Sequence, residues 1–317
     1  MNRRTLLATG AAAAAGASRF FTPAVAFRSF AFAQATPVAN LDAGVSLHTY
    51  AAGPAGFFVN AYLVETPNGI VVIDGTLTVT DATALREQAD EIGKPLLGVL
   101  LTHGHPDHYA GVATLLAGTS VPIVATTATD AIIRRDDAEK DANTRLLLGD
   151  EWPTDRIFPN TTLDDGESVE LDGVVFTVRD LGPGESHADG LWTVSGLPDI
   201  VFIGDTIYSR LHSFLADGHT GAWLDLLASL KPMLGDAVTL FPGHGGATTP
   251  AVLDWQVAYI STVREAVGAA AGGAAQLTDA TRAEARTAIL ERYPEPRLTA
   301  FLDFSLDAVA AELAGEA

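Results

Sequence analysis

The sequence predicts an α/β protein built as an αββα four-layer sandwich, in which two β-sheets pack face to face and helices cover their outer sides. Runs rich in β-branched residues alternate twice along the chain with helical patterns. Hydrophobic residues make up 48% of the chain and charged residues 18%, which is enough apolar material for a packed core. The expected main domain spans 40–250, and the helical pattern beyond His244 predicts a helical C-terminal extension over 251–317.

The first half of the main domain shows strands separated by turns and helices. A hairpin is expected around Thr66-Pro67-Asn68-Gly69, because Pro and Asn-Gly stand in suitable turn positions. Gly93-Lys94-Pro95 should end the helix that precedes the next strand. The expected strands are 58–65, 70–74, 96–101 and 121–125, and the expected helices are 81–92, 109–116 and 130–148.

The second half begins with another hairpin, which turns at Asp172-Gly173. Helix 223–230 carries Trp223, Leu226, Leu227 and Leu230 on one face, as expected for a helix that packs on the core. The expected strands are 168–171, 174–179, 191–195, 200–203 and 238–241, and the helices of the extension are 251–270, 279–293 and 298–313.

Residues 1–33 have the pattern of an export signal. Arg3 and Arg4 precede a short apolar segment and resemble a twin-arginine signal, and small residues at 24–26 and at 31–33 are both typical of cleavage sites. The apolar stretch 6–17 is shorter than the ~20 residues that span a bilayer, so we expect no membrane span. The protein is therefore expected in the periplasm or outside the cell; the alternative is a disordered tail on a cytoplasmic protein.

Charge and cysteine content exclude several classes of function. The formal net charge of −20 argues against a nucleic-acid partner, because phosphate binding requires a basic surface. The chain has no cysteine, so it has no disulfide and no thiolate nucleophile. Any metal must be held by His, Asp or Glu. A small molecule is the expected partner, and the sequence predicts neither the oligomeric state nor the exact substrate.

Potential metal ligands gather in short loops that follow predicted strands. Four of them stand within six residues, namely His103, His105, Asp107 and His108. In extended backbone the first two side chains point to the same side, and the last two open a helix, so the two halves can face two adjacent ions. Three more candidates stand near glycines at other strand ends, and they are His187, Asp205 and His244.

In this order the residues resemble the metallo-β-lactamase superfamily over roughly 51–244. The resemblance implies two zinc ions bridged by Asp205. One zinc would be held by His103, His105 and His187, and the other by Asp107, His108 and His244. Asp74 matches an acidic residue that the family keeps beside the metal loop as a hydrogen-bond partner of the ligands.

The resemblance implies an exported zinc-dependent hydrolase in which a metal-bridging hydroxide cleaves an ester, thioester, lactone or lactam bond. Asp107 would orient that hydroxide and accept its proton. The absence of cysteine excludes the β-lactamases with a Cys ligand. The implied Asp205 bridge is more typical of the thioesterase, lactonase and phosphodiesterase branches, so a β-lactamase is less favoured. One alternative is an iron-dependent sulfur (persulfide) dioxygenase that uses His103, His187 and Asp205. Another is a non-catalytic metal-binding accessory protein.

The substrate pocket is less well defined by the sequence. Tyr208, His212 and His219 follow the bridging Asp, in a segment that forms either a pocket wall or an ordinary loop. Glu185 and Ser186 are interpreted as loop formers, and His48 as a surface residue or a core residue with satisfied hydrogen bonds. The aromatic residues Phe57, Phe58 and Trp152 either line a hydrophobic groove or belong to the core.

Overall fold

The computed structural model describes residues 38–41 and 44–316, which belong to one compact unit. The expected export signal, 1–33, lies outside the described residues. No helix in the described part of the chain has an apolar run long enough to cross a membrane.

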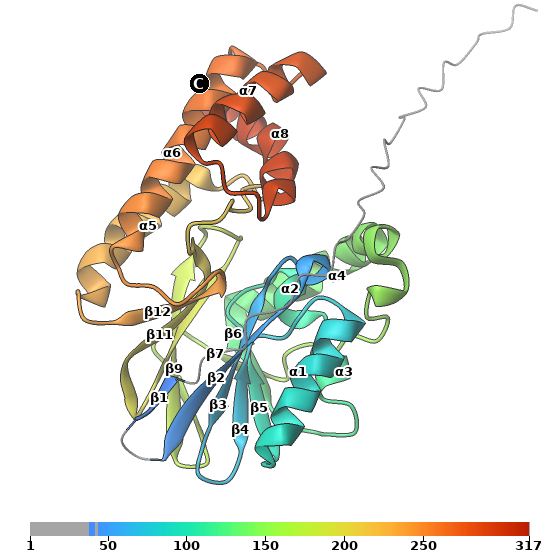
Figure 1. Ribbon diagram of the computed structural model, residues 1–317, viewed down its shortest axis with the longest axis vertical. Coiled ribbons are helices and arrows are strands. Elements are labelled where there is room, and N and C mark those ends of the chain that lie inside the picture. The colour runs from blue at the N-terminus through green and yellow to red at the C-terminus, as the bar shows by residue number, and fades with distance from the viewer. Residues whose placement is uncertain (1–37, 42–43, 317) are drawn as a thin grey trace, which may run out of the picture. The chain divides into compact units, whose positions relative to one another are not determined.

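Two sheets form the centre of this unit and confirm the predicted sandwich (Figure 1). The seven-stranded sheet has the order β1 (Val38–Leu41), β2 (Val45–Ala51), β3 (Asn60–Glu65), β4 (Ile70–Ile73), β5 (Leu96–Leu100), β6 (Ile123–Thr126) and β7 (Thr161–Leu163). The five-stranded sheet has the order β12 (Thr239–His244), β11 (Leu197–Tyr208), β10 (Asp189–Val194), β9 (Val174–Gly182) and β8 (Ser168–Leu171). Strands β4 to β7 are parallel, as are β11 and β12.

The alternation of side chains along each strand explains the layers. In β3, Tyr62 and Val64 pack into the core between the two sheets, whereas Ala61 and Leu63 pack into the core under the helices on the other face. Both sets are buried, so the middle of the strand is apolar on both faces, and the polar residues Asn60 and Glu65 stand at its two ends. A central strand of this kind fixes the register of the sheet, because a shift by one residue would exchange the two cores.

Helices cover the outer face of each sheet. On the seven-stranded sheet they are α1 (Val79–Ile92), α2 (Pro106–Tyr109), α3 (Val112–Leu115) and α4 (Thr127–Leu148). On the five-stranded sheet they are α5 (Thr220–Leu234), α6 (Val252–Ala271), α7 (Asp279–Arg292) and α8 (Thr299–Glu316). Short 3₁₀ turns occupy Pro54–Gly56 and Gly149–Glu151. The expected C-terminal extension shares one apolar core with β11, β12 and α5.

Three details differ from the expected elements. Strand β11 is longer than 200–203, so Asp205 and Tyr208 lie within the strand and not in a loop after it. The expected helix 109–116 is two short helices, because Gly111 donates its N–H to Thr76 O and a side chain at this position would collide with that oxygen. Strands β1, β2 and β7 have no counterpart among the expected elements.

Candidate metal centre

The candidate ligands lie at one edge of the sandwich, where strands of both sheets end. His103 and His105 lie between β5 and α2, and Asp107 and His108 lie in α2. Asp205 lies in β11, and His244 is the last residue of the neighbouring parallel strand β12. Two of these side chains, Asp205 and His244, are therefore held by neighbouring strands of one sheet, and the other four lie in the loop and short helix that follow β5 of the other sheet.

The close approach of β11 and β12 depends on Gly243. A Cβ at this position would lie 1.8 Å from Asp205 Oδ1 and 2.7 Å from His108 Cε1. Because the Cβ position is set by the backbone, the clash could be relieved only by moving the Asp205 carboxylate and the His108 ring away from their places in the site. The glycine next to His244 thus leaves the room in which Asp205 faces the histidines.

Two adjacent groups of buried donor atoms result. The first contains His103, His105 and Glu185, with Glu185 Oε2 3.5 Å from His103 Nε2 and 3.0 Å from His105 Nδ1. The rings of His103 and His108 are 4.1 Å apart between centroids, so the second group lies directly beside the first.

The second group contains Asp107, His108, Asp205 and His244. Asp205 Oδ1 lies 3.4 Å from His108 Nε2, and Asp205 Oδ2 lies 3.2 Å from His244 Nε2. Asp107 Oδ2 lies 3.2 Å from the same His244 nitrogen. Asp205 thus presents an oxygen to each of two histidines.

The hydrogen bonding of these atoms fits bound cations. Within the described residues, five buried nitrogen and oxygen atoms of the two groups have no hydrogen-bond partner. They are His103 Nε2, His108 Nε2, His244 Nε2, Glu185 Oε2 and Asp205 Oδ1. A buried polar atom without a partner costs about 1–3 kcal/mol, more when it is charged. Imidazole and carboxylate are ordinary ligands of divalent transition metals, so metal ions would satisfy all five atoms together.

Each of the four histidines in these groups has its other ring nitrogen fixed by a partner. His103 Nδ1 lies 3.1 Å from Thr102 Oγ1, and His244 Nδ1 lies 2.9 Å from the Phe57 carbonyl oxygen. The carboxylates of Asp217 and Asp74 face His105 Nε2 and His108 Nδ1 at 3.2 Å and 2.9 Å. Such partners orient a ligating imidazole and select its tautomer.

His187 does not join the other expected ligands, and Glu185 stands in its place. His187 Nδ1 lies 2.6 Å from His219 Nε2, and His187 is half-buried outside both groups. The cause is the shape of the loop between β9 and β10. Asp189 accepts hydrogen bonds from the backbone N–H of Glu185 and from the N–H and hydroxyl of Ser186, which turns the Glu185 side chain inward. The role of His187 as a ligand stays a prediction, and the geometry favours Glu185.

Tyr208 links the two groups. Its hydroxyl lies 2.7 Å from Asp205 Oδ2 and 3.0 Å from Glu185 Oε1, so its single O–H is shared between these two carboxylates. Its ring lies parallel to that of His244 at 5.1 Å. The sequence named Tyr208 only as a possible pocket residue and gave Glu185 no role in the site. The Asp-x-x-Tyr spacing alone does not reveal the contact to Glu185, because that contact depends on a loop from a different strand.

Burial and charge shift the pKa values of these groups strongly. Burial raises the pKa of Glu185 to about 8 and that of Asp189 to about 7. Burial alone would lower the pKa of His105, but the carboxylates of Glu185 and Asp217 raise it to about 10. His244 is raised to about 9, because the Asp205 and Asp107 carboxylates outweigh the effect of burial on its pKa.

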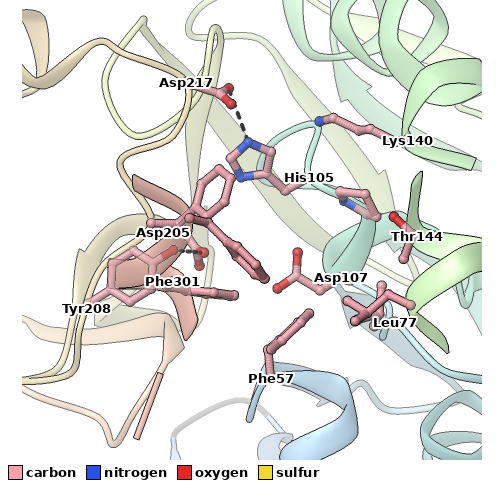
Figure 2. Close-up of a pocket in the computed structure, with 14 residues that line it drawn as sticks. Phe57, Leu77, His105, Asp107, Lys140, Thr144, Asp205, Tyr208, Asp217 and Phe301 are labelled. Carbon is pink, nitrogen blue, oxygen red and sulfur yellow. Dashed lines mark hydrogen bonds and ion pairs between the residues drawn. The ribbon is translucent and has the colours of Figure 1, made fainter. Parts of the chain in front are cut away.

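A cavity of about 200 Å³ opens onto the two groups (Figure 2). Asp107, Asp205, His105 and Tyr208 line it, and Figure 2 shows Phe57 beside Asp107 and Phe301 beside Tyr208. His212 and His219 are not among the lining residues. His212 is buried between Tyr259 and the Glu295 carbonyl, and Trp152 belongs to a small apolar cluster beside α4.

A model of the metallo-beta-lactamase superfamily matches residues 54–244, which include all the residues of both groups. The chain belongs to the metallo-beta-lactamase superfamily. This is a family of metal-dependent hydrolases, so the identification agrees with the donor atoms described above.

Two relatives illustrate how this member of the superfamily compares with others. Over 173 residues the chain is 27% identical to the hydroxyacylglutathione hydrolase GloC of Haemophilus influenzae, a match that covers 53% of this chain and 78% of GloC. A stretch of 62 residues is 42% identical to the uncharacterized protein YobT of Bacillus subtilis, but covers 20% of this chain and only 26% of YobT.

Solved structures show the same fold at low sequence identity. A metallo-beta-lactamase family protein from Thermus thermophilus has a TM-score of 0.60 at 21% identity and covers 85% of this chain and 92% of its own. A beta-lactamase domain protein from Burkholderia ambifaria has a TM-score of 0.59 at 18% identity, with 86% and 85% covered. The DIM-1 metallo-beta-lactamase has a TM-score of 0.55 at 21% identity, with 73% and 98% covered.

Replacing the carboxylate of the first group should remove one metal ion. We expect Glu185→Gln to lower the metal content by about one ion per chain, because an uncharged amide is a much weaker ligand than a carboxylate. Elemental analysis of purified protein measures this directly. His187→Gln is the matched control and should keep the metal content of the unmodified protein. Loss of metal in the His187 variant alone would restore His187 as the ligand.

Metal binding should release protons and strengthen with rising pH. In the metal-free protein the pKa values of His105 and His244 are raised to about 10 and about 9, so both rings carry an extra proton at pH 7 that a cation must displace. The apparent affinity for Zn²⁺ should therefore rise between pH 6 and pH 8. Calorimetric titration in buffers of different ionisation enthalpy counts the protons released. An affinity that does not change with pH would contradict these protonation states.

Proposed function

We propose that this protein is a hydrolase with two divalent metal ions, zinc being the expected metal, that cleaves an ester, thioester, lactone or lactam bond. One observation carries the proposal: two buried groups of unpartnered donor atoms lie side by side at the floor of one cavity, with Asp205 between the histidines. Two ions bound there would supply a Lewis acid for a carbonyl oxygen and a water of lowered pKa.

Asp107 and Tyr208, which line the cavity, have different roles in the proposed reaction. Asp107 is the most accessible donor of the second group, with its side chain 10% exposed against 2% or less for His108, Asp205 and His244. Its carboxylate therefore faces the cavity, where it can orient a water molecule and accept its proton. Tyr208 holds the carboxylates of Asp205 and Glu185 in place through its hydroxyl.

The acyl character of the substrate is supported by the relatives. The name of GloC describes hydrolysis of a hydroxyacylglutathione, and that protein is aligned with about half of this chain. DIM-1 is named as a β-lactamase, but the likeness at 21% identity concerns the fold. We therefore place thioesters, esters and lactones before lactams in the order of testing.

A second candidate function has one observation in its favour. Two histidines and one carboxylate, the composition of the first group, are also the ligands of mononuclear non-haem iron in oxygenases. An iron-dependent sulfur dioxygenase would need only this group. The inward-facing nitrogens of His108 and His244 would then bind no metal ion and would remain without a partner. The two-metal hydrolase is favoured for this reason. Metal analysis separates these two enzymes from each other, and a turnover assay separates both from a non-catalytic metal-binding protein, which would bind metal without turnover.

Loss of the Asp107 carboxylate should stop turnover without unfolding the protein. We expect Asp107→Asn to lower kcat by ~10²–10⁴-fold, the range for a lost acid–base group. The assay uses 4-nitrophenyl acetate, a thioester, a lactone and nitrocefin at saturating zinc, with metal content measured in parallel. Asp254→Asn, an exposed site on α6, is the control. Normal turnover by the Asp107 variant would contradict the proposed role of Asp107. Absence of turnover of every compound by the unmodified protein would contradict the proposed reaction.

We also propose that the protein is exported to the periplasm or beyond by the twin-arginine route, on the strength of Arg3, Arg4 and the apolar segment that follows. A fusion of residues 1–37 to a reporter enzyme should be exported, and replacing both arginines by lysine should retain the reporter in the cytoplasm. Arg19→Lys is the matched control. Cytoplasmic retention of the unmodified fusion would overturn the proposal.

A further inference from the structure

The basic side chains of this acidic protein are almost all neutralised by carboxylates. Within residues 44–316, every lysine and arginine forms an ion pair except Lys140, Arg210 and Arg292. The two arginines are exposed, so water solvates their charges. Lys140 is half-buried and lines the cavity above the metal centre. An ammonium group in that position is exceptional in a chain of net charge −20.

The surroundings of Lys140 leave part of its hydrogen-bonding capacity unused. Its Nζ donates to the Gly104 carbonyl oxygen at 3.0 Å, which is the one partner it has among the described residues. An ammonium group has three donors, so two remain. The nearby carboxylate of Asp217 is engaged by His105 Nε2 at 3.2 Å. Figure 2 shows the ammonium end of Lys140 beside His105, on the side of the cavity where Asp217 also lies.

Apolar side chains form a large part of the cavity lining. Four phenylalanines and two leucines contribute to its lining, and they are Phe57, Phe214, Phe301, Phe304, Leu77 and Leu147. Phe304 is 50% exposed and Leu147 is 60% exposed, although large apolar side chains are rarely so exposed elsewhere in the described chain. Exposed apolar side chains grouped at the mouth of a cavity are typical of a surface that binds an apolar ligand.

We propose that Lys140 binds an anionic group of the substrate, so that the enzyme acts on compounds that join a carboxylate or a similar anion to an aromatic or aliphatic body. The anion would receive the two free donors of Lys140, and the apolar body would lie against Phe57, Phe301 and Phe304. That the bound anion belongs to a substrate rests on the proposed function. The binding of the anion by Lys140 does not itself require hydrolysis. Lys140 is thus a specificity-determining residue.

Burial makes the interaction selective. A half-buried ammonium group is desolvated, and burial accordingly lowers the pKa of Lys140. A ligand anion restores the lost solvation and forms a charge-assisted hydrogen bond, which is stronger than a neutral one. A neutral ligand of the same shape gains only the apolar contacts. Discrimination between an acid and its amide should therefore depend on this one side chain.

The test compares 4-phenylbutyrate with the uncharged 4-phenylbutyramide, using calorimetry on the metal-loaded protein. The unmodified protein should bind the carboxylate more tightly than the amide. Lys140→Met, which keeps the length of the side chain and removes its charge, should weaken carboxylate binding by about 10- to 100-fold and leave amide binding unchanged. Lys140→Arg should restore most of the preference. Lys231→Met, at an exposed ion pair with Asp254, is the matched control.

Two results would overturn the inference. The first is equal affinity of the unmodified protein for the acid and the amide. The second is unchanged carboxylate binding by Lys140→Met at normal metal content, because Lys140 would then serve only to hold the Gly104 carbonyl. Melting temperature and metal content show whether each variant is folded and loaded. Carboxylate binding that depends on Lys140 without turnover of any ester, thioester, lactone or lactam would contradict the proposed hydrolysis and leave the anion site in place.

Discussion

The metal centre depends on the hydrogen bonds of the buried Asp74 carboxylate. Asp74 directly follows β4 and adopts a left-handed backbone conformation, with φ of 60°, which is uncommon for residues other than glycine. Its two oxygens accept hydrogen bonds from the N–H and hydroxyl of Thr102, and its Oδ2 faces His108 Nδ1. Asp74 thereby joins the end of β4 to the start of the metal loop, and orients one ligand directly and His103 through Thr102. Such a constrained residue persists because the surrounding hydrogen bonds determine its position.

The balance of charge at the site follows from the residues that surround it. Asp107, Asp205 and Glu185 are three carboxylates buried near one another, an arrangement that is costly without compensating positive charge. In the metal-free protein the compensation comes from protons, as the raised pKa values of Glu185, His105 and His244 show. Divalent cations would replace these protons and satisfy the nitrogens and oxygens that have no other partner. Folding and metal binding are therefore linked through the same few atoms.

The sequence predicts the sandwich well because each layer has a local signature. The alternation of strands and helices, the turn at Asp172-Gly173 and the density of ligands from His103 to His108 are properties of short segments. Glu185 could not be placed in this way. Whether Glu185 or His187 points inward depends on how Asp189 folds the loop, which is set by hydrogen bonds to the backbone that no spacing rule encodes. Of the three unexpected strands, β1 and β7 have only four and three residues, and most residues of β2 are only partly buried, so their apolar patterns are short or incomplete.

The C-terminal helices belong to the site as well as to the core. Phe301 of α8 packs against the His244 ring at 5.4 Å and against Phe57 at 5.0 Å, so one aromatic side chain touches a candidate ligand, lines the cavity and anchors a helix. Across the cavity, α4 contributes Lys140, Thr144 and Leu147 from the layer that covers the other sheet. The metal-binding groups thus lie on β11, β12, α2 and the loops between strands, whereas α4 and α8 of the two outer layers contribute other side chains that line the cavity. Substitutions in α4 or α8 can change specificity without altering the metal ligands, because the two sets of residues lie on different elements.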